Sequence, residues 1–372
     1  MSRPGTVPHA LFAEKAEAFL AVHRGQDSTR FAGNLVTRVD AVQTGDLRIP
    51  VTVNDATEPP GNAWVCSPTT TYGRYALEES ERLLPGPLRP PLRAAIAVVD
   101  RGMRRRRLDR AVAVDNWLLS TNLHPDLAGI DPNRLVREAR ERWPEHAIWI
   151  RSLNTVQHPD WLRAVADAGF TLIPSRQVYL FRDPSGARPR RDLRRDLRLL
   201  DRTELSAVHH DDFTEDDFAQ AERLYAQLYL DKYSALNPHY TAAFLRAWHG
   251  AGLLELAGFR DGEGILRAVV GMFGQGASLT APVVGYDTSW PQQAGLYRLL
   301  MAHVLRSTRQ RGAELNLSAG AAQFKRLRGG EPAIEYSAVH AAHLPAATRR
   351  AIAALGVLAA RVGVPIMRHW EL

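Results

Sequence analysis

The sequence predicts an α/β protein with two tandem domains, each a mixed sheet flanked by helices. Three observations support this fold class. The length of 372 residues suits two domains of ordinary size. Strand-like and helix-like segments alternate, which requires crossover connections between strands. A stretch rich in proline, glycine and arginine near residues 184–205 separates two halves in which the elements follow one order.

Composition excludes several classes of protein. Hydrophobic residues make up 45% and charged residues 23%, which argues against a disordered or fibrous chain. The one cysteine, Cys66, excludes an intrachain disulfide and a zinc finger, and its apolar context predicts a buried, inert thiol. The sequence shows neither a run of 18 apolar residues nor a secretory signal. We therefore expect a cytoplasmic protein without a membrane span.

The basic residues are unevenly divided. The net charge is +7, yet only Lys15, Lys232 and Lys325 among the 47 basic residues are lysines. An arginine excess of this kind is typical of a GC-rich genome, so it says little about nucleic-acid binding. Because lysine is rare here, each lysine is a stronger candidate for a specific role.

In the first half, periodicity predicts a helical lead-in within residues 1–33 and strands at 34–42, 47–55 and 62–68. A helix is expected from about Tyr75, and prolines near residue 90 separate it from the next helix. The later elements alternate between strand and helix. They are a helix at 92–110, a strand at 109–122, a helix at 131–144, a strand at 146–153, a helix at 158–170 and a closing strand pair at 171–183.

The second half begins with a helix over 213–233, for which Thr214 is the expected N-cap. A hairpin is predicted around Asp261-Gly262, a strong turn signal. The other elements are a helix at 240–252, a strand at 277–289, a long helix at 291–312, strands at 313–320 and 332–340, and a helix at 346–363. We place the domains at 1–185 and 206–372, with an arginine-rich linker at 186–205.

From Leu253 to His340 the pattern resembles the core of a GNAT acyltransferase. It combines a central hairpin, a strand ending in Val-Gly-Tyr-Asp, a glycine turn that opens a long helix, and two further strands. The pair Phe324-Lys325 resembles the aromatic-lysine pair of the Fem-type and cellulose-biosynthesis-type branch. The resemblance covers residues 205–340 and implies two tandem GNAT-like domains, while for 30–183 it rests on element order alone.

The resemblance also implies a donor site at the start of the long helix. The family motif Q/R-x-x-G-x-G/A aligns with residues 292–297. The candidate donor-binding residues in it are Gln292, Gln293, Gly295, Leu296 and Tyr297. Free amides at a helix start suit a diphosphate. Tyr297 replaces the final small residue of the motif, which is compatible with a carrier-protein arm or an aminoacyl-tRNA as donor; a plain helix start after Pro291 is the alternative.

Four residues are candidates for the chemistry. Lys325 follows a strand and a glycine-containing turn, where it could neutralise a phosphate or stabilise an oxyanion, unless it is a solvated loop lysine. Tyr286 and Asp287 end a strand, where ligands of α/β sheets gather, although Asp287 could instead cap the next turn. Tyr336 matches a family role as general acid for the leaving thiolate.

Two further stretches predict an acceptor site. Asn316 and Ser318 place polar side chains on one face of an otherwise apolar strand, which implies a pocket or a structural network. Residues 230–241 concentrate polar and aromatic groups before Pro238 and form either an acceptor loop or a helix C-terminus. The candidates in this stretch are Asp231, Lys232, Tyr233 and Asn237.

The remaining clusters receive plainer interpretations. His209 to Asp212 are adjacent in sequence and so are poorly placed to converge on a metal ion, and we predict no metal site. The arginines over 188–202 recur at helical spacing with interleaved aspartates, which fits a solvated helix. The same run could bind tRNA or an acidic carrier protein.

Together these features predict an enzyme of specialised or cell-envelope metabolism: an N-acyltransferase that joins an acyl thioester, carried by CoA or a carrier protein, to a small amine. Two alternatives remain open: a Fem-type aminoacyltransferase that uses aminoacyl-tRNA, and an inactive tandem-GNAT binding module. No tightly bound cofactor is expected. The partners would be a small amine and an acyl carrier protein or a tRNA.

Overall fold

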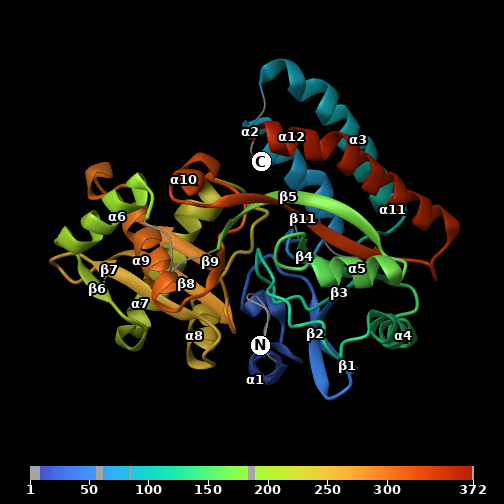
Figure 1. Cartoon of the computed structure of the whole chain (residues 1–372), viewed down its shortest axis with the longest axis horizontal. Helices are drawn as coiled ribbons and strands as arrows, with labels where there is room; N and C mark the ends of the chain where they lie inside the picture. Colours follow the sequence, from blue (N-terminus) through green and yellow to red (C-terminus); the bar gives the residue numbers. More distant parts are fainter. Residues whose placement is uncertain (1–8, 56–61, 84, 183–188, 371–372) are drawn as a thin grey trace.

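One continuous sheet of eleven strands runs through the computed structural model, which describes residues 9–55, 62–83, 85–182 and 189–370 (Figure 1). The strand order is β1-β2-β3-β4-β11-β5-β10-β9-β8-β7-β6. Helices cover both faces, so the predicted α/β class with a mixed sheet in each half is confirmed. Residues 186–188 of the predicted linker lie outside the described residues.

The sheet of the first half follows the predicted order. Its strands are β1 (Arg38–Thr44), β2 (Leu47–Asn54), β3 (Ala111–Val114), β4 (Ala147–Asn154) and β5 (Thr171–Phe181). β1 and β2 form an antiparallel hairpin, and β3 and β4 pair in parallel. A helix connects β3 to β4, as parallel pairing requires.

The second half repeats this arrangement. Its strands are β6 (Ser206–Val208), β7 (Glu255–Arg260), β8 (Leu266–Gln275), β9 (Ser278–Tyr286), β10 (Glu314–Asn316) and β11 (Glu331–His340). The β7–β8 hairpin turns at Asp261, as predicted, and the Asp261 carboxylate accepts hydrogen bonds from the amides of Glu263 and Ile265. β9 and β10 pair in parallel.

The two halves share strands. β11, which the sequence assigned to the second domain, lies between β4 and β5 of the first half and is antiparallel to both. The other edge of β5 pairs with β10 through Phe181 and Leu180. The backbone ladder therefore crosses the predicted domain boundary.

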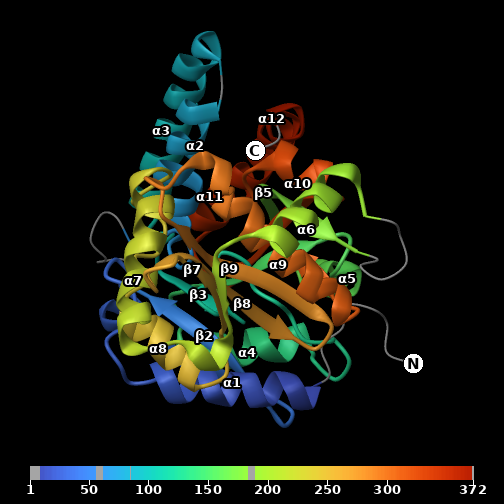
Figure 2. The same ribbon diagram turned by 90° about the vertical axis from the view of Figure 1, so that its left-hand side faces the viewer.

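In the first half the helices are α1 (His9–His23), α2 (Ala76–Leu83), α3 (Arg89–Arg105), α4 (Pro132–Arg142) and α5 (Pro159–Asp167). In the second half they are α6 (Arg191–Arg202), α7 (Glu215–Tyr225), α8 (Ala242–Gly250), α9 (Leu296–Gln310) and α10 (Ala322–Leu327). The C-terminal pair is α11 (Ala346–Leu358) and α12 (Val364–Trp370), which lies over β5 beside α3. In Figures 1 and 2, α2 and α3 lie beside the two C-terminal helices, while α1 and α4 lie at the opposite end of the first half.

Local signals fixed several of these elements. The Thr214 side chain caps α7 and accepts a hydrogen bond from the amide of Asp217, which confirms the predicted N-cap. Residues 62–68 were predicted as a strand and instead form a turn, in which Ala63 O accepts the amides of Cys66 and Ser67. The predicted strand pair at 171–183 is the single strand β5.

The arginine-rich segment forms the helix that its spacing predicted, but one face of this helix is packed rather than solvated. α6 packs along α9 because Leu193 is buried in the core of the second half and Leu199 reaches Gly295. Asp196 is 1% exposed and lies between two arginines. Its carboxylate pairs with Arg298 Nε at 2.6 Å and with Arg328 of α10.

Residues Ala346–Trp370 form one continuous helical stretch through a π-turn at Ala359–Gly363. By length and composition alone this stretch could cross a membrane, which the sequence analysis did not anticipate, and one helix of this kind is weak evidence for a span. One face of it packs on the sheet, where Gly356 approaches Thr171 and Leu172 of β5.

Lys325 occupies a different position from the one predicted. It lies in α10 and is 4% exposed, whereas the sequence offered either a lysine that faces the substrate after a turn or a solvated loop lysine. Its ammonium group donates to the carbonyls of Leu317, Ser318 and Ala319, at 2.6, 3.2 and 2.8 Å. The lysine thus fixes the turn after β10, because three backbone carbonyls take its three donors.

Removal of the Asp196 carboxylate should strongly destabilise the folded protein. Asp196→Ala leaves the buried Arg328 without its counter-charge, and we expect the free energy of unfolding to fall by about 3–5 kcal/mol. Denaturant unfolding measures this change. Asp192→Ala is the matched control on the same helix, because its pair with Arg195 is long, 3.8 Å, and partly exposed, and should be worth under about 1 kcal/mol. Equal losses in the two variants would contradict this account.

The stabilising role of Lys325 should depend on pH. Burial, together with the Arg176 charge, lowers the pKa of Lys325 to about 7. Between about pH 7 and 10.4 the unfolded chain binds more protons than the folded chain, so stability rises with pH. The free energy of unfolding of the wild type should therefore rise relative to that of Lys325→Met as the pH increases over this window. A pH-independent difference would contradict the prediction.

Candidate functional site

A fork in the sheet creates the first candidate site. β10 pairs with β9 only at Glu314–Asn316, while β9 continues for six residues to Tyr286. The two parallel strands separate beyond this point, and α9 begins near the end of β9. Ligands of α/β sheets bind beside the carboxyl ends of such strands.

Gly295 sets the start of α9. Its φ of +64° lies in the left-handed region, and a Cβ there would come within 2.9 Å of Leu199 Cδ2. Glycine is therefore required both for the backbone conformation and for the close approach of α6. No side chain caps α9, and Gly295 and Leu296 at its start line the neighbouring cavity.

The cavity at this point, here called the α9 cavity, encloses about 1140 Å³ including its mouth. It brings together most of the residues predicted from the donor motif and the strand end, along with part of the 230–241 stretch. The predicted residues that line it are Gln292, Gly295, Leu296, Tyr297, Tyr286, Asp287, Asp231 and Lys232. Gln293 is exposed and does not line it.

Aromatic rings occupy the fork. The Tyr297 ring lies 4.8 Å from that of Phe324 in α10 and 6.1 Å from that of Tyr286. Burial raises the pKa of Tyr297 well above its usual value, so its hydroxyl stays protonated. The bulky residue at the sixth motif position therefore packs between α9 and α10.

Asp287 is held by its own turn. Its carboxylate accepts hydrogen bonds from the amide and hydroxyl of Ser289 and pairs with Arg267 at 2.9 Å. Burial alone would raise the pKa of Asp287, but the bonds from Ser289 and Arg267 lower it overall. An ionised, well-paired carboxylate is a weak base, so the geometry favours the capping role that the sequence left open.

Other predicted acceptor residues lie elsewhere. Asn237 binds backbone carbonyls of Tyr229 and Ser234 and accepts from Trp64 Nε1 at 2.9 Å, which ties the 230–241 stretch to the first half. Tyr233 is 41% exposed and lies outside the α9 cavity. Asn237 and Tyr233 thus lie outside the predicted acceptor site. For Asn237 the reason is its contact with Trp64, a residue distant in sequence.

The remaining candidates are also apart from the α9 cavity. Asn316 is fully buried and its side-chain oxygen accepts the amide of Ser318 at 2.9 Å, which makes it part of a structural network. Tyr336 lines a separate hollow beside Gln177 and Pro332. Its predicted role as general acid at the donor site is incompatible with this placement.

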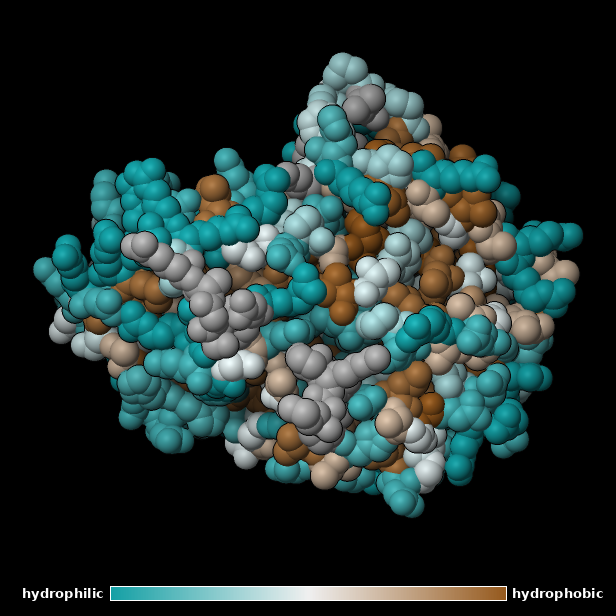
Figure 3. Space-filling model, in the orientation of Figure 1, coloured by the Kyte–Doolittle hydropathy of each residue, from teal (hydrophilic) through white to brown (hydrophobic). Residues whose placement is uncertain are grey.

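A second cavity, here called the interhelical cavity, was missed by the sequence analysis. It lies between α2–α3 and α11–α12, encloses about 1200 Å³ including its mouth, and is lined mainly by apolar side chains. Figure 3 shows hydrophobic residues gathered on this side of the molecule. Its polar lining includes Arg176, Ser175, Thr71 and Glu79.

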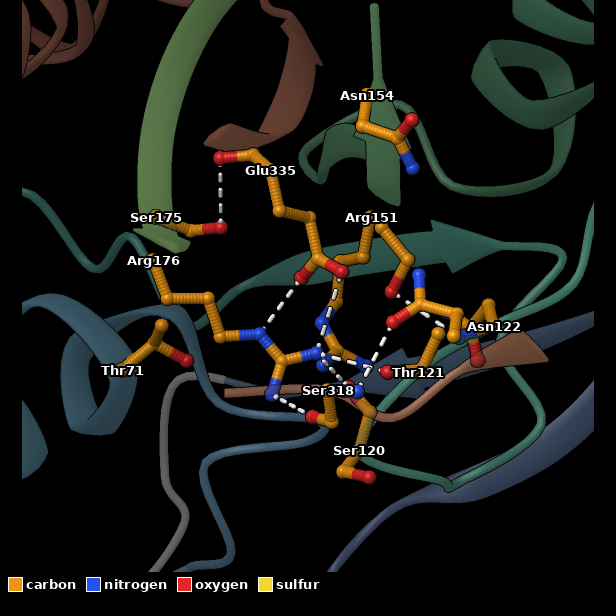
Figure 4. Close-up of polar contacts among 12 residues, drawn as sticks. Thr71, Ser120, Thr121, Asn122, Arg151, Asn154, Ser175, Arg176, Ser318 and Glu335 are labelled. Atoms are coloured by element: carbon orange, nitrogen blue, oxygen red, sulfur yellow. Dashed lines mark hydrogen bonds and ion pairs between the residues drawn. The ribbon is translucent and has the colours of Figure 1, made fainter. Parts of the chain in front are cut away.

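Arg176 is the centre of a buried polar network at the inner end of this cavity (Figure 4). Its guanidinium group pairs with Glu335 of β11, at 2.8 Å from Nε to Oε1, and donates to Ser318 Oγ at 2.8 Å. It also donates to Thr121 Oγ1 at 3.1 Å and stacks on Trp64 at 4.8 Å. The predicted residue Ser318 therefore belongs to this network.

Tyrosine side chains line both cavities. Tyr75 lines the interhelical cavity, and Tyr286 and Tyr297 line the α9 cavity. Ala319, at the end of the turn held by Lys325, also lines the interhelical cavity. The turn that follows β10 therefore borders the interhelical cavity.

Within the described ranges, no group of three or more His, Cys, Asp or Glu side chains is arranged to hold a metal ion. His210 instead stacks on His249, at 3.9 Å between ring centroids, and its Nδ1 accepts the amide of Leu256. The histidine pair near residue 210 therefore takes part in packing.

Residues 187–326 match the family model of an acetyltransferase (GNAT) domain. No curated protein sequence matches the chain. Among solved structures, it is similar to the C-terminal domain of a putative lysylphosphatidylglycerol synthetase from Agrobacterium fabrum, with a TM-score of 0.53 and 14% identity over 93% of this chain and 96% of that one.

Two other structures are similar over nearly their whole length. L-PGS from Bacillus licheniformis has a TM-score of 0.51 and 12% identity, covering 95% of this chain and 99% of that one. FemX has a TM-score of 0.50 and 10% identity, covering 87% and 95%. The second half, with its glycine-opened α9, thus contains the stretch that matches a GNAT acetyltransferase domain, and the whole chain shares the fold of these three structures.

Proposed function

We propose that this chain is an N-acyltransferase that joins the acyl group of a thioester to an amine, with the donor held in the α9 cavity. The observation that carries the proposal is the convergence of Gln292, Gly295 and Tyr297 with Tyr286 and Lys232 around one cavity at a free helix start. The amides of such a helix start and a nearby cation suit the phosphates of a donor.

The chemistry needs no covalent enzyme intermediate. The nitrogen of a neutral amine attacks the thioester carbonyl, the C–N bond forms, the C–S bond breaks, and the thiolate takes up a proton as the amine loses one. The enzyme contributes positioning and a path for the proton. Asp231 lines the exposed side of the α9 cavity and is better placed to receive a proton than Asp287, which Arg267 and Ser289 engage.

A second candidate is aminoacyl transfer from a charged tRNA. The ring of Tyr297 packs where the family motif has a small residue, which narrows the space for a free CoA. The structures of FemX and of L-PGS share this fold, and their names point to the same class of reaction. α6 adds exposed arginines directly beside α9, at Arg191, Arg195 and Arg198.

A panel of donors tests the function. Acyl-CoAs, acyl carrier proteins and aminoacyl-tRNAs are incubated with simple amines, and products are identified by mass spectrometry. Amide formation from a thioester is the expected result, and amide formation from aminoacyl-tRNA alone would establish the second candidate. Absence of turnover with every donor would leave the inactive binding module.

Lys232→Met should separate donor binding from chemistry. Loss of a charge-assisted hydrogen bond to a phosphate costs roughly 1.5–3 kcal/mol, so KM for the donor should rise about tenfold or more, with kcat nearly unchanged. Lys15→Met is the matched control, because Lys15 lies on α1 and donates to Gly252 O. If only the KM for the acceptor rises, Lys232 binds the acceptor, as the sequence predicted, and does not bind the donor.

The arginines of α6 distinguish the two donors. Changing Arg191, Arg195 and Arg198 to Gln should raise the KM for a tRNA donor strongly and reduce its salt dependence, by roughly 0.7 in log–log slope per lost single-strand phosphate contact. The matched control replaces Arg101, Arg105 and Arg106 at the end of α3. Unchanged KM with every donor would assign the α6 arginines to solvation.

A further inference from the structure

The walls of the interhelical cavity are apolar over a long distance. α3 contributes Leu92, Ile96 and Val99, and the facing helices contribute residues from Leu355 to Met367. Twelve helical steps separate those last two residues, which corresponds to roughly 18 Å along the helix axis. The space is therefore elongated between two helical layers, a shape that suits a chain better than a compact ring.

The apolar lining is uncovered at the outer end. Val362 lines the cavity and is still 41% exposed. Leaving such surface in contact with water forgoes about 25 cal/mol for each Å² that a ligand would cover. Cavities of this kind, with a few polar groups at one place, are typical ligand sites.

The inner end is polar with its charges already balanced. Arg176 is neutralised by Glu335, and Glu79 pairs with Arg82. Burial raises the pKa of Glu79, which further reduces its tendency to carry charge. An inner end of this composition suits an uncharged polar group, such as the carbonyl of an ester, amide or thioester, better than a free phosphate or ammonium group.

We infer that the interhelical cavity binds the linear alkyl chain of an amphiphilic substrate, with an uncharged polar group of that substrate beside Arg176 and the end of β10. This inference deepens the proposed acyl transfer and rests on it only for the identity of the polar group. The chain could belong to the acyl donor or to an alkyl amine acceptor, because both would place the same apolar chain between α3 and α11–α12.

The test uses the full chain and measures binding without turnover. Octyl, decyl and dodecyl esters of glycerol are titrated below their critical micelle concentrations by calorimetry. Each added methylene should tighten the Kd by about three- to fourfold, because the chain lengthens inside an apolar cavity. A Kd that does not change with chain length would overturn the inference, whatever any variant does.

A matched pair of variants locates the binding site. Ala95→Phe fills the cavity from α3 and should weaken dodecyl binding at least about tenfold, while Ala97→Phe, at an exposed position of the same helix, should change it less than about twofold. Ala359→Phe fills the cavity from the opposite wall and serves if Ala95→Phe does not fold. Equal effects of Ala95→Phe and Ala97→Phe would overturn the assignment.

Two substrate arms identify the source of the chain. Dodecanoyl-CoA with a short amine tests a chain on the donor, and dodecylamine with acetyl-CoA tests a chain on the acceptor; in the productive arm, Ala95→Phe should raise KM about tenfold. If alkyl compounds bind but neither arm gives turnover, the interhelical cavity still binds an alkyl chain, and the proposed acyl transfer is contradicted. Binding to phospholipid vesicles with no length-dependent binding of the monomeric esters would replace the cavity by a membrane-facing surface and overturn the inference.

Discussion

The pairing of β5 on both of its edges holds this molecule together. One edge of β5 bonds to β11 along most of its length, and the other bonds to β10 at Phe181 and Leu180. Through these two edges, β5 joins the hydrogen-bonded strands of one half of the sheet to those of the other half. The relative position of the α9 cavity and the interhelical cavity is therefore set by a backbone ladder, which is stiffer than the side-chain contacts that usually join two domains.

The Arg176–Glu335 ion pair depends on this strand order. The arginine is on β5 and the carboxylate on β11, so they meet only because β11 is inserted beside β5. The same guanidinium group donates to Ser318 after β10, while the ammonium group of Lys325 donates to the carbonyls of that turn. Two basic side chains thus fix the segment where the halves meet, and each donates hydrogen bonds to oxygen atoms there.

The parts of the site that follow from local sequence were predictable. The start of α9 depends on Gly295 and its neighbours, and the hairpin at Asp261 and the Thr214 cap depend on residues within four positions of each other. Arg176 and the interhelical cavity were not predictable, because they need α3, β5 and the C-terminal helices, which are more than 150 residues apart at the extremes. The one available signal was an arginine among the apolar residues of a predicted strand. Lys325 was identified as unusual from its rarity, but its burial depends on where the carbonyls after β10 point.

The insertion of β11 also has a consequence for the order of folding during synthesis. The first half has the strands β1 to β5 once residue 181 has been made, yet the position between β4 and β5 stays empty until residues 331–340 leave the ribosome. Until then the facing edges of β4 and β5 carry unpaired amides and carbonyls, a state prone to pairing with other chains. Completion of the sheet in the first half therefore waits for the synthesis of the second half.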